Sequence, residues 1–420
     1  MRNRDRATLR LGPGLITGAC NDDPSSIGTY SQVGAQFGFT LTWTLLVSFP
    51  LLVAVQEISA RIARVSGLGL AGNLRRHCPA WLAAALILLL GAANIFNLAA
   101  DLGAMGAVLR LLLGVPALLY VCLLGMASVL IEMLTRYARY VRLLRWLSLS
   151  LLSYVAAAFV VELPWTEMAQ AFLWPPLSRS PQYLLAVLAT LGTTISPYLL
   201  FWQAQQEVEE AHHGSAPALL DAIEQAPKQF ARIRLDTLIG MGLAAVVALS
   251  IVITSAATLH AYGVQTIQSA AQAAEALRAL GGHFTFLLFA LGIIGAGLLA
   301  LPALSTSTAY AVGELLGWPV GRRHTRNRAR AFYVTVGTAT ALAVGLNFTP
   351  LDPLRALYLS SVINGVIAVP LLAAMMFLAS NVRVMGALRI PTGLAVLGWL
   401  TLATLAGSVA AVMIAWPGRS

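Results

Sequence analysis

The stretch that decides the fold is TGACNDDPSSIGTYSQ, residues 17–32, which interrupts the first long apolar segment of the chain. It holds two adjacent acids, Asp22 and Asp23, followed directly by Pro24. Proline breaks a membrane-spanning helix, and a buried carboxylate is costly unless it is paired or coordinated. We therefore expect a broken helix whose freed carbonyl groups and carboxylate bind a cation. A second interpretation is a proline-kinked helix whose acid faces a water-filled pocket without binding a substrate.

The composition around this stretch is that of a polytopic membrane protein. The chain has 420 residues, of which 58% are hydrophobic and 10% charged, whereas soluble domains carry about 25% charged residues. We count eleven apolar segments close to the ~20 residues that a span requires, and no soluble domain, so residues 1–420 are predicted to form one transmembrane domain. The segments are residues 11–35, 39–61, 80–104, 115–135, 144–162, 182–206, 236–259, 284–315, 331–348, 354–380 and 391–416.

The excess of basic residues indicates orientation in the bilayer and not nucleic-acid binding. The formal net charge is +10, with 27 lysines and arginines. If the N-terminus is cytoplasmic, all but five of them fall on the cytoplasmic side, the pattern of inner-membrane proteins. The exceptions are Arg110, Arg179, Arg278, Arg355 and Arg419. We predict a monomer in the inner (plasma) membrane with a cytoplasmic N-terminus and an outer C-terminus.

A second broken segment indicates an internal repeat. Pro197 lies in the middle of the sixth span, in GTTISPYLL at residues 192–200. Pro24 opens one group of five spans and Pro197 opens the next, so the two groups enter the membrane in opposite senses. We predict an all-α, LeuT-type inverted repeat of five plus five helices, with helices 1 and 6 broken. The repeats are predicted at about 11–162 and 182–380, with an extra helix at 391–416.

Four segments resemble the Nramp family of divalent-metal transporters. They are LGPGLITGACNDDPSSIGTYSQVGAQFGF at 11–39, VQEISARIARVSG at 55–67, LGTTISPYLLFWQ at 191–203 and YLSSVINGVIAVPLLAAMMFLASNVRVMG at 358–386. The resemblance implies alternating access, with a divalent metal ion as the transported substrate and no cofactor. It also implies a metal-ligand set at the two breaks and on the tenth span, namely Asp23, Ser26, Cys20 and Thr193 (the last two through their carbonyl groups), Ser196, Ser361 and Asn364.

The chain departs from the family pattern at the residues that set metal preference. The family's first motif usually reads D-P-G-N, and here it is Asp23, Pro24, Ser25 and Ser26. Ser196 stands where the family usually has methionine, which removes the soft sulfur ligand. An oxygen-only site suits Mg²⁺, which keeps several of its waters, and also Mn²⁺. This pattern resembles the branch of Nramp-related magnesium transporters.

The departures also affect proton coupling. Tyr198 and Gln203 stand where the family usually has histidines, and Ala104 stands where it often has a glutamate. Asp23 and Asp101 remain as candidate proton carriers, if burial favours their neutral forms. Entry driven by the membrane potential and proton symport are therefore both open. Asp22 either attracts cations in the cytoplasmic vestibule or pairs with a nearby arginine.

Three alternatives remain to a transporter for Mg²⁺ or Mn²⁺. A conventional proton-coupled Mn²⁺/Fe²⁺ symporter is the nearest alternative. A transporter of organic solutes would leave a half-helix N-terminus open to a substrate carboxylate, which Asp23 would repel. An intramembrane hydrolase needs paired acids, a serine with a base or H-E-x-x-H, and none of these lies in a span.

Two further charge patterns lie near the ends of predicted spans. Glu57 and Arg61 are four residues apart in the favourable helical order, which predicts an ion pair. The run EVEEAHH at 207–213 is predicted to be a solvated acidic helix end. The alternative is that its acids and histidines bind metal that leaves the pore.

Overall fold

A computed structural model describes residues 12–134, 148–161, 163–213, 216–265, 270–320, 329–350 and 352–415, and this part of the chain contains helices and no strands. In chain order the elements are α1 Pro13–Asn21, α2 Pro24–Phe37, η1 Gly38–Leu41, α3 Thr42–Ser66, α4 Leu70–His77, α5 Ala80–Leu113, α6 Ala117–Leu134, η2 Ser148–Leu151, α8 Leu152–Val160, α9 Trp165–Leu173, α10 Pro181–Thr194, α11 Pro197–His213, η3 Ile223–Gln225, α12 Ala226–Ser255, η4 Ala256–His260, α13 Ala270–Leu316, α14 Arg330–Leu346, α15 Pro353–Ser380, α16 Val382–Met385 and α17 Thr392–Ala415.

Eight helical runs in the described residues are long and apolar enough to cross a membrane. The difference from the predicted eleven spans has local causes. The broken segment gives two short helices, and α2 continues through η1 into α3, so two predicted spans merge into one run, Pro24–Ser66. The predicted span 331–348 is the 17-residue helix α14. The predicted span 144–162 lies partly outside the described residues. Four arginines predicted on the cytoplasmic side lie wholly outside them, namely Arg136, Arg139, Arg142 and Arg145.

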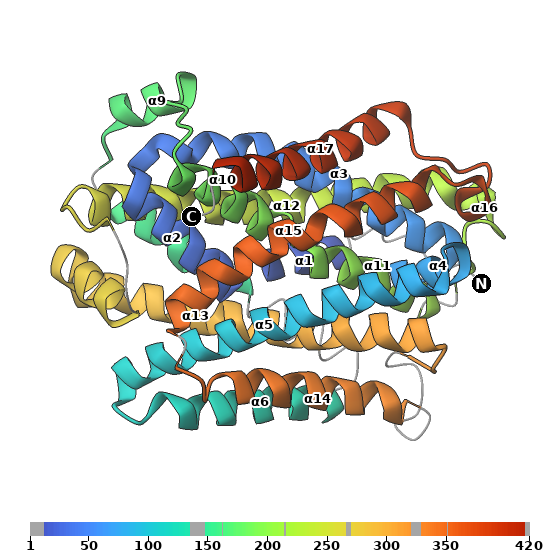
Figure 1. Ribbon diagram of the computed structural model, residues 1–420, viewed down its shortest axis with the longest axis horizontal. Coiled ribbons are helices and arrows are strands. Elements are labelled where there is room, and N and C mark those ends of the chain that lie inside the picture. Colours follow the sequence, from blue (N-terminus) through green and yellow to red (C-terminus); the bar gives the residue numbers. More distant parts are fainter. Residues whose placement is uncertain are drawn as a thin grey trace, which may run out of the picture.

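The helices form a bundle around the two broken pairs (Figure 1). The long helix α5 packs along α13 and α15, and α1 packs along α12. α6 and α14 lie together at one edge of the bundle, and α17 lies at the opposite edge against α3 and α15. These edge helices expose large apolar side chains, such as Met126 on α6 and Trp399 on α17, as expected of surfaces that face lipid.

Both predicted breaks are present, and their backbones match. α1 ends at Asn21 and α2 begins at Pro24, while α10 ends at Thr194 and α11 begins at Pro197. The first residue of each break has nearly the same conformation, with φ −94° and ψ 57° at Asp22 and φ −107° and ψ 59° at Ile195. This agreement is what two copies of one ancestral broken helix would give.

Small residues let the broken helices approach their neighbours closely. A Cβ atom added to Gly18 of α1 would lie 2.1 Å from the carbonyl oxygen of Gly240 on α12. A Cβ atom added to Gly192 of α10 would lie 2.2 Å from the carbonyl oxygen of Ser361 on α15. Backbone contact of this kind fixes helices in a membrane, where the hydrophobic effect between helices is absent.

Candidate functional site

Asp23 lies at the centre of the contacts between the two breaks. It caps α2: its Oδ1 atom accepts hydrogen bonds from the Ser26 amide at 2.7 Å and the Ser26 hydroxyl at 2.8 Å. Its Oδ2 atom accepts from Asn97 Nδ2 of α5 at 3.0 Å and lies 3.2 Å from the Tyr198 hydroxyl oxygen of α11. Asp23 is 1% exposed. One carboxylate therefore joins three elements in a buried setting.

Ser26 and Thr193 connect the two breaks directly. Their hydroxyl oxygens lie 2.7 Å apart, and the Ser26 hydroxyl also lies 2.7 Å from the carbonyl oxygen of Asn21. The Ser196 hydroxyl donates to the Thr193 carbonyl at 2.7 Å. The structure thus brings Asp23, Ser26, Thr193 and Ser196 together, as the sequence predicts.

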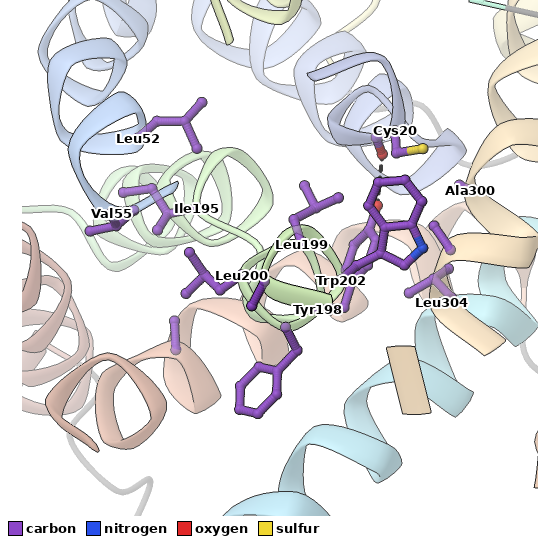
Figure 2. Close-up of a cluster of buried hydrophobic side chains, with 14 of the residues drawn as sticks. Cys20, Leu52, Val55, Ile195, Tyr198, Leu199, Leu200, Trp202, Ala300 and Leu304 are labelled. Atoms are coloured by element: carbon purple, nitrogen blue, oxygen red, sulfur yellow. Dashed lines mark hydrogen bonds between the residues drawn. The ribbon is translucent and has the colours of Figure 1, made fainter. Parts of the chain in front are cut away.

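Tyr198 closes the same region from the side of α11 and contacts Cys20. Its hydroxyl donates to the Cys20 carbonyl at 2.7 Å, the dashed line in Figure 2. The Cys20 thiol lies 3.7 Å from the Leu299 carbonyl on α13, so the carbonyl and not the sulfur belongs to the break. Leu199 and Trp202 of α11 form part of the apolar surroundings in Figure 2.

Asp101 reaches the break through the first turn of α2. Its Oδ1 atom accepts from the Ser25 amide at 3.0 Å and from the Ser25 hydroxyl at 2.8 Å. Ser360 of α15 donates to the Ser25 hydroxyl at 3.0 Å. Asp101 therefore lies one hydrogen-bonded residue away from the Asp23–Pro24 step.

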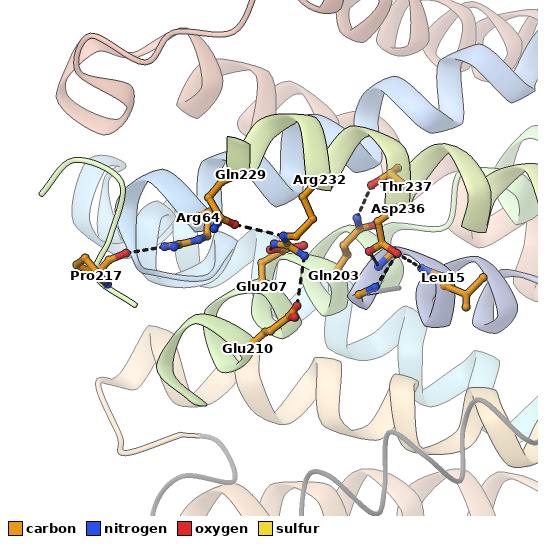
Figure 3. A network of polar contacts seen from close by, with 12 residues as sticks. Leu15, Arg64, Gln203, Glu207, Glu210, Pro217, Gln229, Arg232, Asp236 and Thr237 are labelled. Atoms are coloured by element: carbon orange, nitrogen blue, oxygen red, sulfur yellow. Dashed lines mark hydrogen bonds and ion pairs between the residues drawn. The ribbon is translucent and has the colours of Figure 1, made fainter. Parts of the chain in front are cut away.

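Three predicted residues lie further from Asp23. The Ser361 hydroxyl lies 2.7 Å from that of Thr29, one helical turn beyond Ser26. Asn364 is buried on α15 one turn after Ser361. Gln203 donates to Thr237 Oγ1 of α12 at 3.0 Å, which places it in the network at the start of α1 (Figure 3).

Sequence reasoning missed Asn97 and Ser25. Asn97 binds Asp23, and Ser25 binds Asp101. A signal for Asn97 was present, because it lies one turn before Asp101 on the apolar helix α5 and so faces the same side.

Buried oxygen atoms without partners surround the break. Among the described residues, Asn21 Oδ1, both carboxylate oxygens of Asp22, Asn97 Oδ1 and Asp101 Oδ2 are buried and accept no hydrogen bond. All five atoms are oxygens able to accept, and leaving such atoms unpaired is costly. No ion pair within the described part of the chain reaches Asp22, Asp23 or Asp101. The region is therefore short of positive charge and of hydrogen-bond donors.

A closed metal cage is not preformed. The described residues contain no group of three or more His, Cys, Asp and Glu side chains arranged to hold a metal ion. Hydroxyl, carbonyl and amide oxygens supply most of the polar atoms at the break. Oxygen atoms of this kind suit hard cations, which often keep part of their water.

A second polar network anchors the beginning of α1 (Figure 3). Asp236 of α12 accepts from the amides of Gly12 at 2.8 Å, Gly14 at 2.6 Å and Leu15 at 3.3 Å. An acid at a helix N-terminus is favourable because it satisfies free N–H groups and complements the helix dipole. One side chain of α12 thus holds the first half of broken helix 1.

The acidic run at 207–213 is solvated only toward its end, where His212 is exposed, so the prediction of a solvated run is wrong for Glu207 and Glu209. Glu207 is 1% and Glu209 is 5% exposed. Arg232 of α12 pairs with Glu207 and, at 3.4 Å, with Glu210, while Glu209 accepts from the Tyr310 hydroxyl. The predicted pair of Glu57 with Arg61 is confirmed at 2.6 Å.

Comparison with known proteins gives the family. Residues 14–415 match the family model described as natural resistance-associated macrophage protein-like, or Nramp. The chain belongs to the Nramp family. This confirms the resemblance drawn from the sequence and the prediction that the chain is a transporter and not an enzyme.

Individual Nramp relatives agree over nearly the whole chain. The chain is 28% identical to the divalent metal cation transporter MntH of Klebsiella pneumoniae (strain 342), over 94% of this chain and 91% of that protein. It is also 28% identical to MntH of Pectobacterium carotovorum subsp. carotovorum (strain PC1), over 84% of this chain and 81% of that protein.

Solved structures confirm the fold. The manganese transporter of Eremococcus coleocola superposes with a TM-score of 0.75 at 18% identity, over all of this chain and 91% of that one. MhsT in complex with L-phenylalanine superposes with a TM-score of 0.64 at 13% identity, over 99% of both chains. The predicted all-α fold of LeuT type, with helices 1 and 6 broken, is thus confirmed.

Proposed function

We propose that this Nramp protein is a secondary transporter that imports a divalent cation, Mg²⁺ or Mn²⁺, by alternating access through the site at the two helix breaks. The observation that carries the proposal is the set of buried acceptor oxygens without partners around Asp23. A cation satisfies acceptors directly, and the waters that it retains donate hydrogen bonds to those further away.

The hardness of the oxygen set supports Mg²⁺ as the first candidate and Mn²⁺ as the second. Ser196 supplies a hydroxyl where the family pattern leads one to expect a thioether, and the Cys20 thiol contacts Leu299 on another helix. Carboxylate, carbonyl and water ligands suit both ions, whereas Cd²⁺ gains most from sulfur. The MntH relatives and the Eremococcus protein are described as divalent-metal and manganese transporters, which supports the same cargo class.

The proposal includes transport driven by the membrane potential, without stoichiometric proton movement, and the residues around the breaks support it. Tyr198 and Gln203 occupy the positions of the family's histidines, and neither is a proton carrier near neutral pH. The conventional proton-coupled Mn²⁺/Fe²⁺ symporter is the second candidate. It is favoured by one contact, the pair of hydrogen bonds from Ser25 to Asp101, which places a second acid next to the Asp23–Pro24 step.

The orientation of the protein in the bilayer rests on the distribution of basic residues. With the N-terminus in the cytoplasm, the Asp236–α1 network closes the cytoplasmic side, and release of the ion inward requires α1 to separate from α12. We place the protein in the inner membrane, acting as a monomer, with the metal ion as its cargo.

A competition-binding titration of the purified protein with Mg²⁺, Mn²⁺, Ca²⁺ and Cd²⁺ tests the cargo. We expect Mg²⁺ and Mn²⁺ each to displace the other, and Asp23→Asn to abolish both. The matched control is Asp352→Asn, since Asp352 caps α15 away from the breaks and asparagine caps equally well. Binding of Cd²⁺ far tighter than that of Mg²⁺ would contradict the hard-site argument.

A further inference from the structure

Asp22 is the acid at the break whose charge the described structure leaves without a partner. It ends α1, is 0% exposed, and neither carboxylate oxygen accepts a hydrogen bond from the described residues. The neighbouring Asn21 Oδ1 is also buried and without a partner. Three acceptor oxygens in two consecutive residues therefore have no donor.

The carboxylates of the other two acids at the break, Asp23 and Asp101, have hydrogen-bond donors. Asp23 accepts hydrogen bonds from Ser26 and Asn97 and lies close to the Tyr198 hydroxyl, and Asp101 accepts two from Ser25. These donors stabilise a carboxylate when no ion is present. Asp22 has no such support from the described residues, so its charge is strongly unfavourable in the empty site and is relieved when a cation arrives.

The position of Asp22 links this relief to the transported ion. Asp22 and Asp23 are consecutive residues, with α-carbons about 3.8 Å apart across a trans peptide. The field of Asp22 therefore acts on any ion that Asp23 binds, and it is weakly screened because the site is buried. Two formal negative charges together match one divalent cation.

We propose that Asp22 is a second anionic group of the transport site and sets its preference for divalent over monovalent cations. This inference rests on the proposed function. It adds Asp22 to the transport site as the residue that makes binding depend on the charge of the ion. Asp22 acts on the ion through space or through a retained water, while Asp23 is the direct ligand.

The electrostatic argument gives a quantitative signature. The Coulomb energy of an ion in the field of Asp22 is proportional to the charge of the ion. Removing that field changes the logarithm of the dissociation constant twice as much for a divalent as for a monovalent ion. A loss of roughly a hundredfold for Mg²⁺ thus corresponds to roughly tenfold for Li⁺.

The test measures displacement of bound Mn²⁺ by Mg²⁺ and by Li⁺ in the wild type, Asp22→Asn and Asp22→Glu, with Asp352→Asn as the control for loss of one acid. Asp22→Asn should weaken Mg²⁺ about a hundredfold and lower the preference for Mg²⁺ over Li⁺ about tenfold. Asp22→Glu keeps the charge and should retain the preference. Asp22→Ser, which is neutral and smaller, gives the same readout if the asparagine variant does not fold.

Two results would overturn the inference. One is Mg²⁺ affinity within twofold of the wild type in Asp22→Asn, which means that Asp22 carries no charge felt by the ion. The other is an equal loss for Mg²⁺ and Li⁺, which means that the substitution only disturbs the break. Neither result contradicts the proposed function, which is tested separately by metal binding and transport in Asp23→Asn.

Discussion

At the scale of single residues, the site owes its chemistry to hydroxyl groups in place of softer or larger side chains. Ser26 and Ser196 each turn their hydroxyl toward backbone carbonyls of the break, and Ser26 also meets Thr193. Small side chains leave room for water around an ion, and their oxygen atoms do not favour soft metals.

Replacing Ser196 tests this account of metal preference. Ser196→Met should raise the affinity for Cd²⁺ relative to Mg²⁺ roughly tenfold, because a thioether prefers softer ions. Ser196→Leu is the matched control, since leucine has a similar volume and no sulfur. The measurement is the ratio of the two dissociation constants. An equal change in both variants would show that size and not softness is responsible.

At the scale of helices, α1 is held by α12 at two places. Asp236 binds the amides at the beginning of α1, and the contact of Gly18 with Gly240 allows the two backbones to touch further along. A short helix of nine residues is unstable alone, so these contacts determine whether α1 stays in place.

Asp236→Ala should loosen α1 without unfolding the bundle. Loss of a helix cap costs about 0.5–2 kcal/mol, and 1.4 kcal/mol is a tenfold change in an equilibrium. We expect the buried Cys20 thiol to react with a maleimide roughly tenfold faster, in a background where Cys78 and Cys122 are replaced by serine. Asp352→Ala, which removes the cap of α15, should leave the rate unchanged. Equal rates in all three proteins would mean that Asp236 does not hold α1.

The positions of the breaks were predictable because a proline coincides with polar residues in the middle of a span. Pro24 and Pro197 each begin a helix after an interruption, whereas Pro50, Pro302 and Pro370 lie inside the continuous helices α3, α13 and α15. The number of helices that span the membrane was harder to predict, because η1 links α2 to α3 in one continuous run. Hydropathy alone does not show where one helix continues into the next.

The site was only partly predictable for the same reason. Residues adjacent to the prolines, such as Asp23 and Ser196, come together because the breaks meet. Ser25 joins through packing of α5 and α15 against α2, which sequence spacing does not reveal, whereas the spacing of Asn97 from Asp101 on α5 was a usable signal. Gln203, six residues after Pro197 in the sequence, contacts α12 instead, because about 1.7 turns of helix bring it to a different side of α11.

At the scale of the whole molecule, the proposed site is buried inside the helix bundle. Asp23, Ser26 and Thr193 are all buried, so the proposed transport requires helices to separate on one side or the other before an ion reaches them. Whether protons accompany the metal then depends on acids and not on histidines at the breaks.

Vesicles with a pH-sensitive dye inside test the coupling. Under an imposed membrane potential, metal should enter while the internal pH stays constant, and an inward proton gradient should not accelerate entry. Acidification that depends on metal would contradict this. In that case Asp101→Asn decides the carrier: uptake retained without acidification would assign the proton to Asp101, whereas loss of both is expected for Asp23 because it also binds the ion.

Uptake of Mg²⁺ and Mn²⁺ into vesicles containing either the wild type or Asp23→Ala tests the central claim most directly. Asp23 connects both broken helices and α5, so its loss should abolish uptake of both ions while the purified variant keeps the helical content and elution volume of the wild type. Uptake by Asp23→Ala at the wild-type rate would contradict the assignment of the transport site to the helix breaks.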